Sequence, residues 1–166
     1  FERGFLMARY KCLTCEAVET VTDLCLQACS RCGGPVFDLD RYEATRAEAT
    51  IIGAQNDAFR KALGPAEWQG QHLRGRVFVT HGIREMGAGF VEAALAATRA
   101  DTNFMDDHSR YGARSFGMPD VRHEGDSFLI YWKIDLYDND ESMGPEVESD
   151  PAQTIRVLTL CLPEEY

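Results

Sequence analysis

The 166-residue sequence contains no long apolar run and no familiar catalytic signature. A membrane-spanning helix needs roughly 18 or more consecutive apolar residues, and no window of the chain approaches this, so no membrane span is expected. The motifs of common enzymes are also missing: there is no G-x-S-x-G elbow, P-loop, dinucleotide-binding fingerprint or H-E-x-x-H zinc motif. The enzyme classes that carry these motifs are therefore excluded, and the sequence discloses no reaction.

An export signal is missing as well. The N-terminal segment FERGFLMARYKC has charges on both sides of a very short apolar piece, which is not typical of a signal peptide. We therefore expect a cytoplasmic protein. Met7 is expected as the natural start, with the residues before it a vector or upstream remnant.

Basic residues are scarce relative to acidic ones. The chain has 17 Lys and Arg against 27 Asp and Glu, a net charge of −10 and a pI of about 4.8. A field of this sign repels phosphate backbones, so generic nucleic-acid binding is disfavoured. Two interpretations stay open: the charge serves solubility, or an acidic surface docks onto a basic, nucleic-acid-binding protein.

What the sequence does contain is a cysteine cluster near its N-terminus. Five of the six cysteines lie between residues 10 and 34, and four of them form two C-x-x-C pairs, Cys12 with Cys15 and Cys29 with Cys32. Two such pairs across a short hairpin can place four thiolates tetrahedrally around one zinc ion. The pattern therefore predicts Zn²⁺ bound by these four residues.

The residues around the pairs predict a zinc-ribbon-like module over residues 8–37. Gly33 suits the tight turn after the second pair, whereas Glu16 stands at the matching place after the first. Disulfide bonds are disfavoured because reducing compartments keep thiols free. Zinc ribbons serve nucleic acids, proteins and stability alike, but the mixed charges of this segment favour a structural or protein-facing role.

Two cysteines lie outside the pairs. Cys25 stands four residues before Cys29, so it either replaces a ligand or is a small buried apolar residue, and we expect the latter. Cys161 lies in a strand pattern far along the chain and is expected in the core.

The rest of the chain is predicted to form an α+β domain over residues 50–166, preceded by a linker or helix over 38–49. Apolar residues near helical spacing predict helices over about 42–63 and 88–100. Gly53 is a point at which the first helix could divide into a linker helix and a domain helix.

Strands are predicted at residues 75–82, on both sides of the turn sequence HEGD, and at 154–162. In the strand after the turn, large apolar residues alternate with Lys133 and Asp135, so one face belongs to the core and the other is partly polar. The strand residues expected in the core are Trp132, Ile134, Leu158 and Leu160. The expected fold is α+β: a mainly antiparallel sheet of about four strands packed with two helices, plus the N-terminal module.

Several short motifs together resemble a known bacterial family. They are NDAFR (56–60), VFVTHGI (77–83), FG (116–117), WKIDLYD (132–138), TIRVLTL (154–160) and the terminal EEY. In order and spacing they resemble domain of unknown function 3768, over about residues 50–166. The resemblance implies no activity; it implies a setting on plasmids and other mobile elements, near antirestriction and plasmid-maintenance genes.

The sequence departs from the family in the loop before FG. The family's loop usually runs like D-N-D-P-Y-G-E-H-D-F-G, whereas this chain has DHSRYGARSFG. Ala113, Arg114 and Ser115 therefore stand where Glu, His and Asp would be. If that trio is a metal or acid–base site in the family, this chain lacks it, which weighs against catalysis.

Protein interaction is the preferred function. A small acidic domain with a zinc module and no catalytic signature suits a protein partner with a basic surface, and the resemblance implies an inhibitor of a host defence system, restriction or CRISPR. Binding groups tend to sit on loops of a rigid sheet. The loop residues expected to bind the partner are Asp138, Asp140, Glu141, Glu146, Glu148 and Asp150.

Two alternative functions stay open. The first is a nucleic-acid-binding zinc-ribbon protein whose basic patch surrounds the first helix, although acidic residues interleave there. The residues of that patch are Arg41, Arg46, Arg60, Lys61, Arg74 and Arg76. The second is a metal-dependent hydrolase using Asp135 and Lys133 beside Tyr131 and Tyr137.

The hydrolase alternative has weaknesses. A nuclease motif of the P-D…(D/E)-x-K type fails, because Tyr131 stands two residues before Lys133. The Lys133–Asp135 pair is also typical of a half-exposed ion pair. The other candidate acid–base or metal groups are Asp106, Asp107, His108, Asp138 and Asp140. The sequence does not indicate the oligomeric state.

Overall fold

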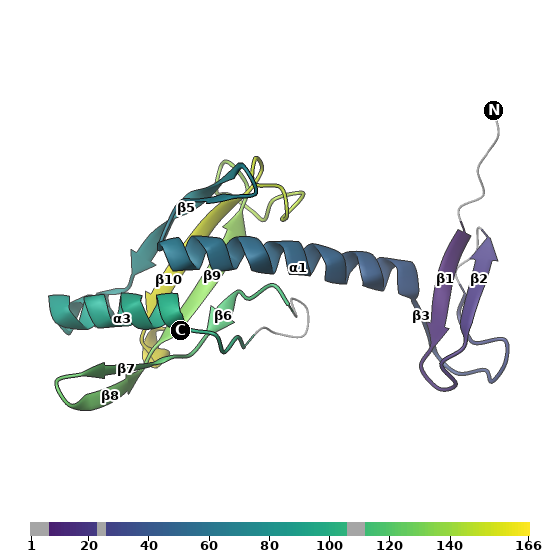
Figure 1. Cartoon of the computed structure of the whole chain (residues 1–166). Helices are drawn as coiled ribbons and strands as arrows, with labels where there is room; N and C mark the ends of the chain where they lie inside the picture. The colour runs from purple at the N-terminus through teal and green to yellow at the C-terminus, as the bar shows by residue number, and fades with distance from the viewer. Residues whose placement is uncertain (1–6, 23–25, 106–111) are drawn as a thin grey trace. The chain divides into compact units, whose positions relative to one another are not determined.

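The computed structural model describes residues 7–22, 26–105 and 112–166 (Figure 1). The chain divides into two compact units, Phe1–Glu48 and Ala49–Tyr166. Both contain antiparallel strands, and the second adds helices, so the predicted α+β class with an N-terminal cysteine module is confirmed. Among the described residues, no helix combines the length and apolar character that crossing a membrane requires.

The first unit is built on a small antiparallel sheet in the order β2-β1-β3. Its strands are β1 (Met7–Cys12), β2 (Val18–Thr22) and β3 (Val36–Asp38). The loop after β1 carries the first cysteine pair, and the loop before β3 carries the second. Tyr10, Cys12 and Cys29 are its buried apolar residues. So small a core contributes little stability, and a metal ion held by the cysteines would add to it.

Helix α1 (Leu39–Ala62) begins in the first unit and ends in the second. The side chain of Asp38 accepts a hydrogen bond from the backbone N–H of Arg41 at 2.9 Å, as an N-cap residue does. The helix runs without interruption through Gly53, so the expected division there is wrong. A side chain at Gly53 would collide with the carbonyl oxygen of Gly112, which explains the glycine as a point of close approach.

The second unit contains a five-stranded sheet in the order β4-β5-β10-β9-β6. Its strands are β4 (Ala66–Trp68), β5 (Gln71–Val79), β6 (Phe116–Gly117), β9 (Tyr131–Tyr137) and β10 (Ile155–Cys161). Only β5 and β10 pair in parallel. The sheet exceeds the four predicted strands because β4 and β6 have three and two residues, too few to show an alternating pattern.

The HEGD sequence forms the turn of a separate hairpin, between β7 (Asp120–His123) and β8 (Asp126–Leu129). Glu124 and Gly125 both have positive φ, as the two central residues of a type I′ turn require. The turn itself was therefore predicted correctly. The strands beside it were expected as one long pair, but β8 ends at Leu129 and β9 joins the main sheet instead.

The remaining helices are α2 (His81–Glu85), α3 (Ala88–Ala100) and the short 3₁₀ helix η1 (Pro163–Glu165). The prediction for α3 is confirmed. The strand predicted over 75–82 begins earlier and ends at Val79, because Thr80 starts the turn into α2. The C-terminal half of α1 and α3 lie on the same face of the sheet (Figure 1).

The core lies between those helices and the sheet. The strand residues predicted to be buried, Trp132, Ile134, Leu158 and Leu160, are all at most 2% exposed. The Cys161 prediction is also confirmed, since the residue is buried.

Two arginines share this core. Arg60 donates to the carbonyl oxygen of Arg99 at 3.0 Å and to Asp57 at 3.0 Å, with its guanidinium over the Trp132 ring. Arg156 is held by the side-chain amide oxygens of Gln55 and Asn56. Placing Arg60 in a basic surface patch was therefore wrong: its charge is satisfied inside the protein.

Candidate functional site

The two cysteine pairs form matching turns in the first unit. In the first, the backbone N–H groups of Thr14 and Cys15 donate to the Cys12 sulfur at 3.3 and 3.4 Å. In the second, the N–H of Gly34 donates to the Cys32 sulfur at 3.4 Å. Such N–H···S contacts favour the thiolate form of a cysteine, which is the form that binds metal ions.

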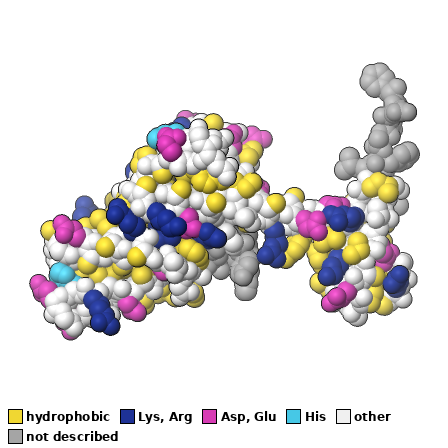
Figure 2. All heavy atoms as spheres, viewed as in Figure 1, with side chains coloured by type: hydrophobic (Ala, Val, Ile, Leu, Met, Phe, Trp, Pro, Cys, Tyr) yellow, Lys and Arg dark blue, Asp and Glu magenta, His cyan; other side chains and the backbone are white. Residues whose placement is uncertain are grey.

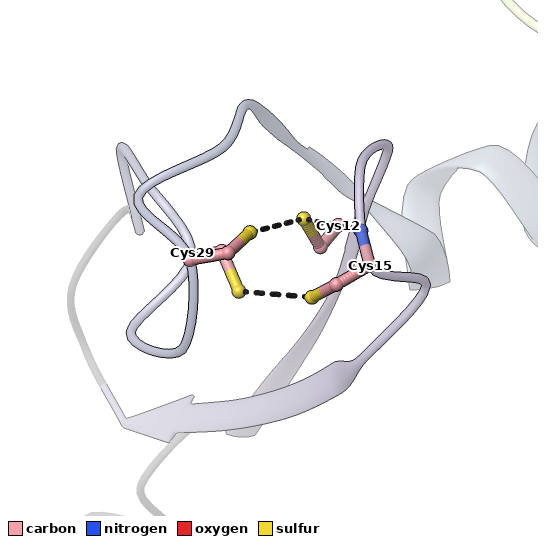
Figure 3. Close-up of side chains that lie close together, drawn as sticks. Cys12, Cys15 and Cys29 are labelled. Atoms are coloured by element: carbon pink, nitrogen blue, oxygen red, sulfur yellow. Dashed lines mark hydrogen bonds between the residues drawn. The ribbon is translucent and has the colours of Figure 1, made fainter.

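The four sulfurs converge on one point. They all lie within 4.8 Å of one another, with Cys12 and Cys32 3.6 Å apart and Cys15 and Cys29 also 3.6 Å apart (Figure 3). At a metal–sulfur distance of about 2.3 Å, the sulfurs of a regular tetrahedron are about 3.8 Å apart. These separations exceed the roughly 2.05 Å of a disulfide. The cluster therefore fits a tetrahedral metal site, and in the part of the chain that the structure describes it is the one group of three or more His, Cys, Asp or Glu with such geometry.

Both turns use a residue with positive φ directly after the pair. Gly33 has a φ of 70°, as expected, and Glu16 has a φ of 59°. Glutamate at this place therefore does not prevent the turn; it adopts the left-handed conformation at a conformational cost that glycine avoids.

The electrostatics differ among the sulfurs. The backbone N–H of Cys15, followed in effect by that of Thr14, lowers the pKa of Cys12 to about 6. For Cys29, the hydrogen bond from the backbone N–H of Cys32 lowers the pKa. Desolvation by burial and the side chains of Glu19 and Cys15 outweigh this effect and raise the pKa to about 12. The cluster therefore holds protons that a metal must displace, so metal binding is coupled to proton release.

Cys25 lies outside the described residues, and its expected burial as an apolar residue stays a prediction. The five described cysteines are free thiols.

The acidic loop 138–150 follows β9 and is ordered by its own carboxylates. Asp138 accepts hydrogen bonds from the backbone N–H of Ser142 at 2.9 Å and from its hydroxyl at 3.1 Å. Asp150 accepts from the N–H of Ala152 at 2.9 Å and from Gln153 at 2.7 Å. These bonds, led by the Ser142 and Ala152 N–H groups, lower the pKa of both carboxyls. Asp138 and Asp150 thus shape the loop.

The loop is also tied to β5. Glu141 forms an ion pair with Arg76, and Arg74 donates to the side-chain oxygen of Asn139 at 2.6 Å. Two arginines of the expected basic patch, Arg74 and Arg76, are therefore engaged by the loop.

Further along the same loop, Asp140 and Glu146 line a shallow pocket of about 370 Å³ together with Met143, which is 66% exposed. Glu148 contributes its backbone carbonyl, which accepts a hydrogen bond from the Thr154 hydroxyl at 3.2 Å. Sequence reasoning included the acidic residues but missed Met143, whose position between two acidic segments gave no periodic signal.

Lys133 and Asp135 form a half-exposed ion pair, as one reading of the sequence expected. Their charged atoms are 2.9 Å apart, and the side chains are 38% and 37% exposed. The hydrogen bond to Asp135 raises the pKa of Lys133, so the amine stays protonated and is a poor general base near neutral pH. The pair lines a pocket of about 420 Å³ with Phe116 and Tyr166.

The other candidate acid–base groups fall into two sets. Asp138 and Asp140 belong to the acidic loop. Among the described residues, no histidine lines the pocket beside them. Asp106, Asp107 and His108 lie outside the described residues.

Positions 113–115 lie against the end of α1 and against β9. The carbonyl oxygen of Ala113 accepts a hydrogen bond from Asn56 at 2.9 Å. Arg114 forms an ion pair with Asp57, which also binds Arg60. Ser115 accepts a backbone hydrogen bond from Ile134 at 2.7 Å. Asp57, which the sequence did not single out, is thus a structural carboxylate here, shared by two arginines.

The fold and the sites together define an α+β protein with a four-cysteine module that can hold a metal ion. Residues 79–165 match the family model described as protein of unknown function (DUF3768), and the chain belongs to this family. The resemblance stated from the motifs is thereby confirmed over residues 79–165. The expected start near residue 50, with the NDAFR motif, lies outside the matched residues, as does the cysteine module. No curated protein and no solved structure matches the chain.

Proposed function

We propose that the chain is a zinc-containing protein-interaction module of the cytoplasm. The metal stabilises the first unit, and the acidic loop of the second unit binds a protein with a basic surface. The observation that carries the second part is the loop itself: its own hydrogen bonds fix it, and Asp140 and Glu146 border the exposed Met143. A fixed loop loses little conformational entropy on binding.

Zinc is the metal that the donor set favours. Tetrahedral sites of four thiolates hold zinc or iron, and zinc is the usual ion of paired C-x-x-C turns. Metal analysis of protein purified without chelator should find about one zinc per chain. Bound iron, or no metal, would overturn the assignment.

The ligand set has its own test. Cys29→Ser should abolish zinc binding, because it removes one of the four converging sulfurs. Cys25→Ser is the matched control and should leave zinc content unchanged. The reverse result would make Cys25 the ligand.

The partner is proposed to be a nucleic-acid-binding protein of a host defence system, restriction or CRISPR. This step rests on the resemblance to a mobile-element family and on the charge of −10, which suits a protein that occupies a basic nucleic-acid channel. Exposed Met143 adds an apolar contact of the kind enriched at interfaces.

The test compares two variants of equal charge. Asp140→Asn/Glu146→Gln removes two charges from the loop pocket, and Glu124→Gln/Asp126→Asn removes two from the β7–β8 hairpin. Capture of a host protein should be lost with the first and kept with the second, and should weaken with added salt because exposed charges are screened. Equal capture by both variants would contradict the loop as the binding site.

Direct nucleic-acid binding finds less support. Figure 2 shows a row of Lys and Arg side chains across the visible face of the second unit, and an acidic side chain interrupts that row. Of the expected basic patch, Arg60 is buried and Arg76 is paired with Glu141.

A further inference from the structure

The C-terminal part of β5 has one edge whose backbone groups pair with no other described strand of its sheet. On one side, β5 pairs with β10 from Arg74 to Val79. On the other, β4 pairs only with residues Gln71–Leu73. Within the described parts of the chain, no strand pairs with the outer edge of β5 beyond Leu73. In Figure 1 this edge of β5 is the margin of the sheet.

The hydrogen-bonding pattern identifies the open groups. The N–H of Thr80 donates to the carbonyl oxygen of Leu160, so the even-numbered residues of β5 bond to β10. Backbone groups alternate in direction along a strand, so those of Gly75, Val77 and Val79 point to the open edge. β4 does not extend to cover them in the same register, because Gly64, which would stand opposite Gly75, instead donates its N–H to the carbonyl oxygen of Phe59 at 3.1 Å.

The side chains along this edge are largely apolar. Val77 and Val79 are partly buried against the core, and Phe78, on the opposite face, is 49% exposed. An open edge with such residues is a template for pairing with another strand. Arg76, the charged residue beside them, is already paired with Glu141.

We infer that two copies of this chain associate through β5, in an antiparallel pair centred on Val77. The open groups are symmetric about this residue: Gly75 meets the partner's Val79, and Val77 meets the partner's Val77. All three outward N–H groups and all three carbonyl groups of each strand then find partners.

The same register suits the side chains. Arg76 stands opposite the partner's Phe78, so a cation faces an aromatic ring rather than a second cation. A foreign peptide could use the edge as well, but the symmetry of the open groups and the placing of Arg76 opposite an aromatic ring favour a second copy. Edge pairing buries little area, so weak, concentration-dependent association is expected.

The test uses the full, zinc-loaded chain in sedimentation experiments over a concentration series. The wild type should dimerise. Phe78→Lys places a cation opposite the partner's Arg76 and should weaken the dimer roughly tenfold or more, whereas Phe78→Tyr, the matched control, should keep it. Val77→Pro removes an outward N–H while leaving the bonds to β10 in place, and should have the same effect as the lysine.

Hydrogen exchange gives an independent readout. The amides of Gly75, Val77 and Val79 should exchange more slowly as the dimer forms, while those of Arg76 and Phe78, already bonded to β10, should not change. If Val77→Pro does not fold, Phe78→Lys decides. A wild type that stays monomeric would overturn the inference. So would a dimer that Phe78→Lys does not weaken and whose formation does not slow exchange of the outward β5 amides. Protection of the edge by an added peptide in a monomeric wild type would also overturn it, in favour of another occupant.

Discussion

The hydroxyl of Thr80 donates a hydrogen bond to the Glu165 carboxylate across 2.6 Å, joining the end of β5 to the last residues of the chain. The same carboxylate accepts the backbone N–H of Gly82 at 2.8 Å and that of Leu162 at 2.9 Å. A side chain at Gly82 would stand 2.9 Å from this carboxylate. Two of the motifs that carry the family resemblance, VFVTHGI and the terminal EEY, therefore meet in one hydrogen-bonded contact.

This contact predicts a pH dependence. The Thr80 hydroxyl, followed by the Leu162 and Gly82 N–H groups, lowers the pKa of Glu165 below its ordinary value of 4.5. A carboxyl with a depressed folded-state pKa stabilises the protein above its unfolded pKa, and that contribution is lost as the pH falls through the folded value. Glu165→Gln should therefore lower Tm near neutral pH, and the difference from wild type should shrink as the pH falls below 4.5 and through the lowered pKa of Glu165.

Glu164→Gln is the matched control, because it removes the same charge one residue away from the contact. It should leave Tm near that of the wild type across the range. A Glu165→Gln effect that is equally large in acid would show that the carboxylate charge is not what stabilises the contact.

The turns after the two cysteine pairs predict opposite effects of two substitutions. Gly33→Ala should destabilise the metal-bound unit by about 1–2 kcal/mol, because the positive φ is costly for alanine. The alanine Cβ would meet no atom within 4 Å, so this cost comes from the backbone alone. Glu16→Gly should be neutral or stabilise by up to about 1 kcal/mol. Competition for zinc with a chelator measures both, since metal binding and folding are coupled. Equal loss of zinc affinity in both variants would mean that the left-handed turns do not govern the site.

Sequence patterns predicted the features that repeat. Helix α3 was found at its observed bounds because apolar residues recur at helical spacing over its length. The four converging cysteines were identified because the C-x-x-C spacing places two thiols on one turn. The alternation through β9 identified its buried face because one face packs on the core and the other does not.

What the sequence did not reveal depends on contacts between distant segments. Arg60 was expected in a surface patch and Arg156 was not singled out, yet both are buried because carbonyl and amide oxygens from other elements accept their hydrogen bonds. The parallel pairing of β5 with β10 was missed for the same reason, since about 75 residues separate the two strands and no local signal gives the direction of pairing.

The buried face of β9 predicts a large loss of stability on truncation. Trp132 is fully buried, donates a hydrogen bond to Asp101 at 2.7 Å and packs under Arg60. Trp132→Ala should therefore lower the free energy of unfolding by about 3–5 kcal/mol, measured by denaturant titration. Tyr131→Ala, on the opposite face, is the control and should cost clearly less. A loss below about 1 kcal/mol for Trp132→Ala would contradict the role of this residue in the core.

The last prediction separates partner binding from catalysis at two places on the same unit. The interaction function depends on the loop carboxylates Asp140 and Glu146, whereas a hydrolase would depend on Asp135 with Lys133. Asp135 holds Lys133 protonated, and the pair is half-exposed, so Asp135→Asn should alter little beyond a weak surface interaction. In cells, the loop variant Asp140→Asn/Glu146→Gln should therefore lose activity while Asp135→Asn retains it. If Asp135→Asn alone eliminates activity in a folded protein, and the loop variant stays active, the pocket beside Tyr166 is a catalytic site and the interaction function is wrong.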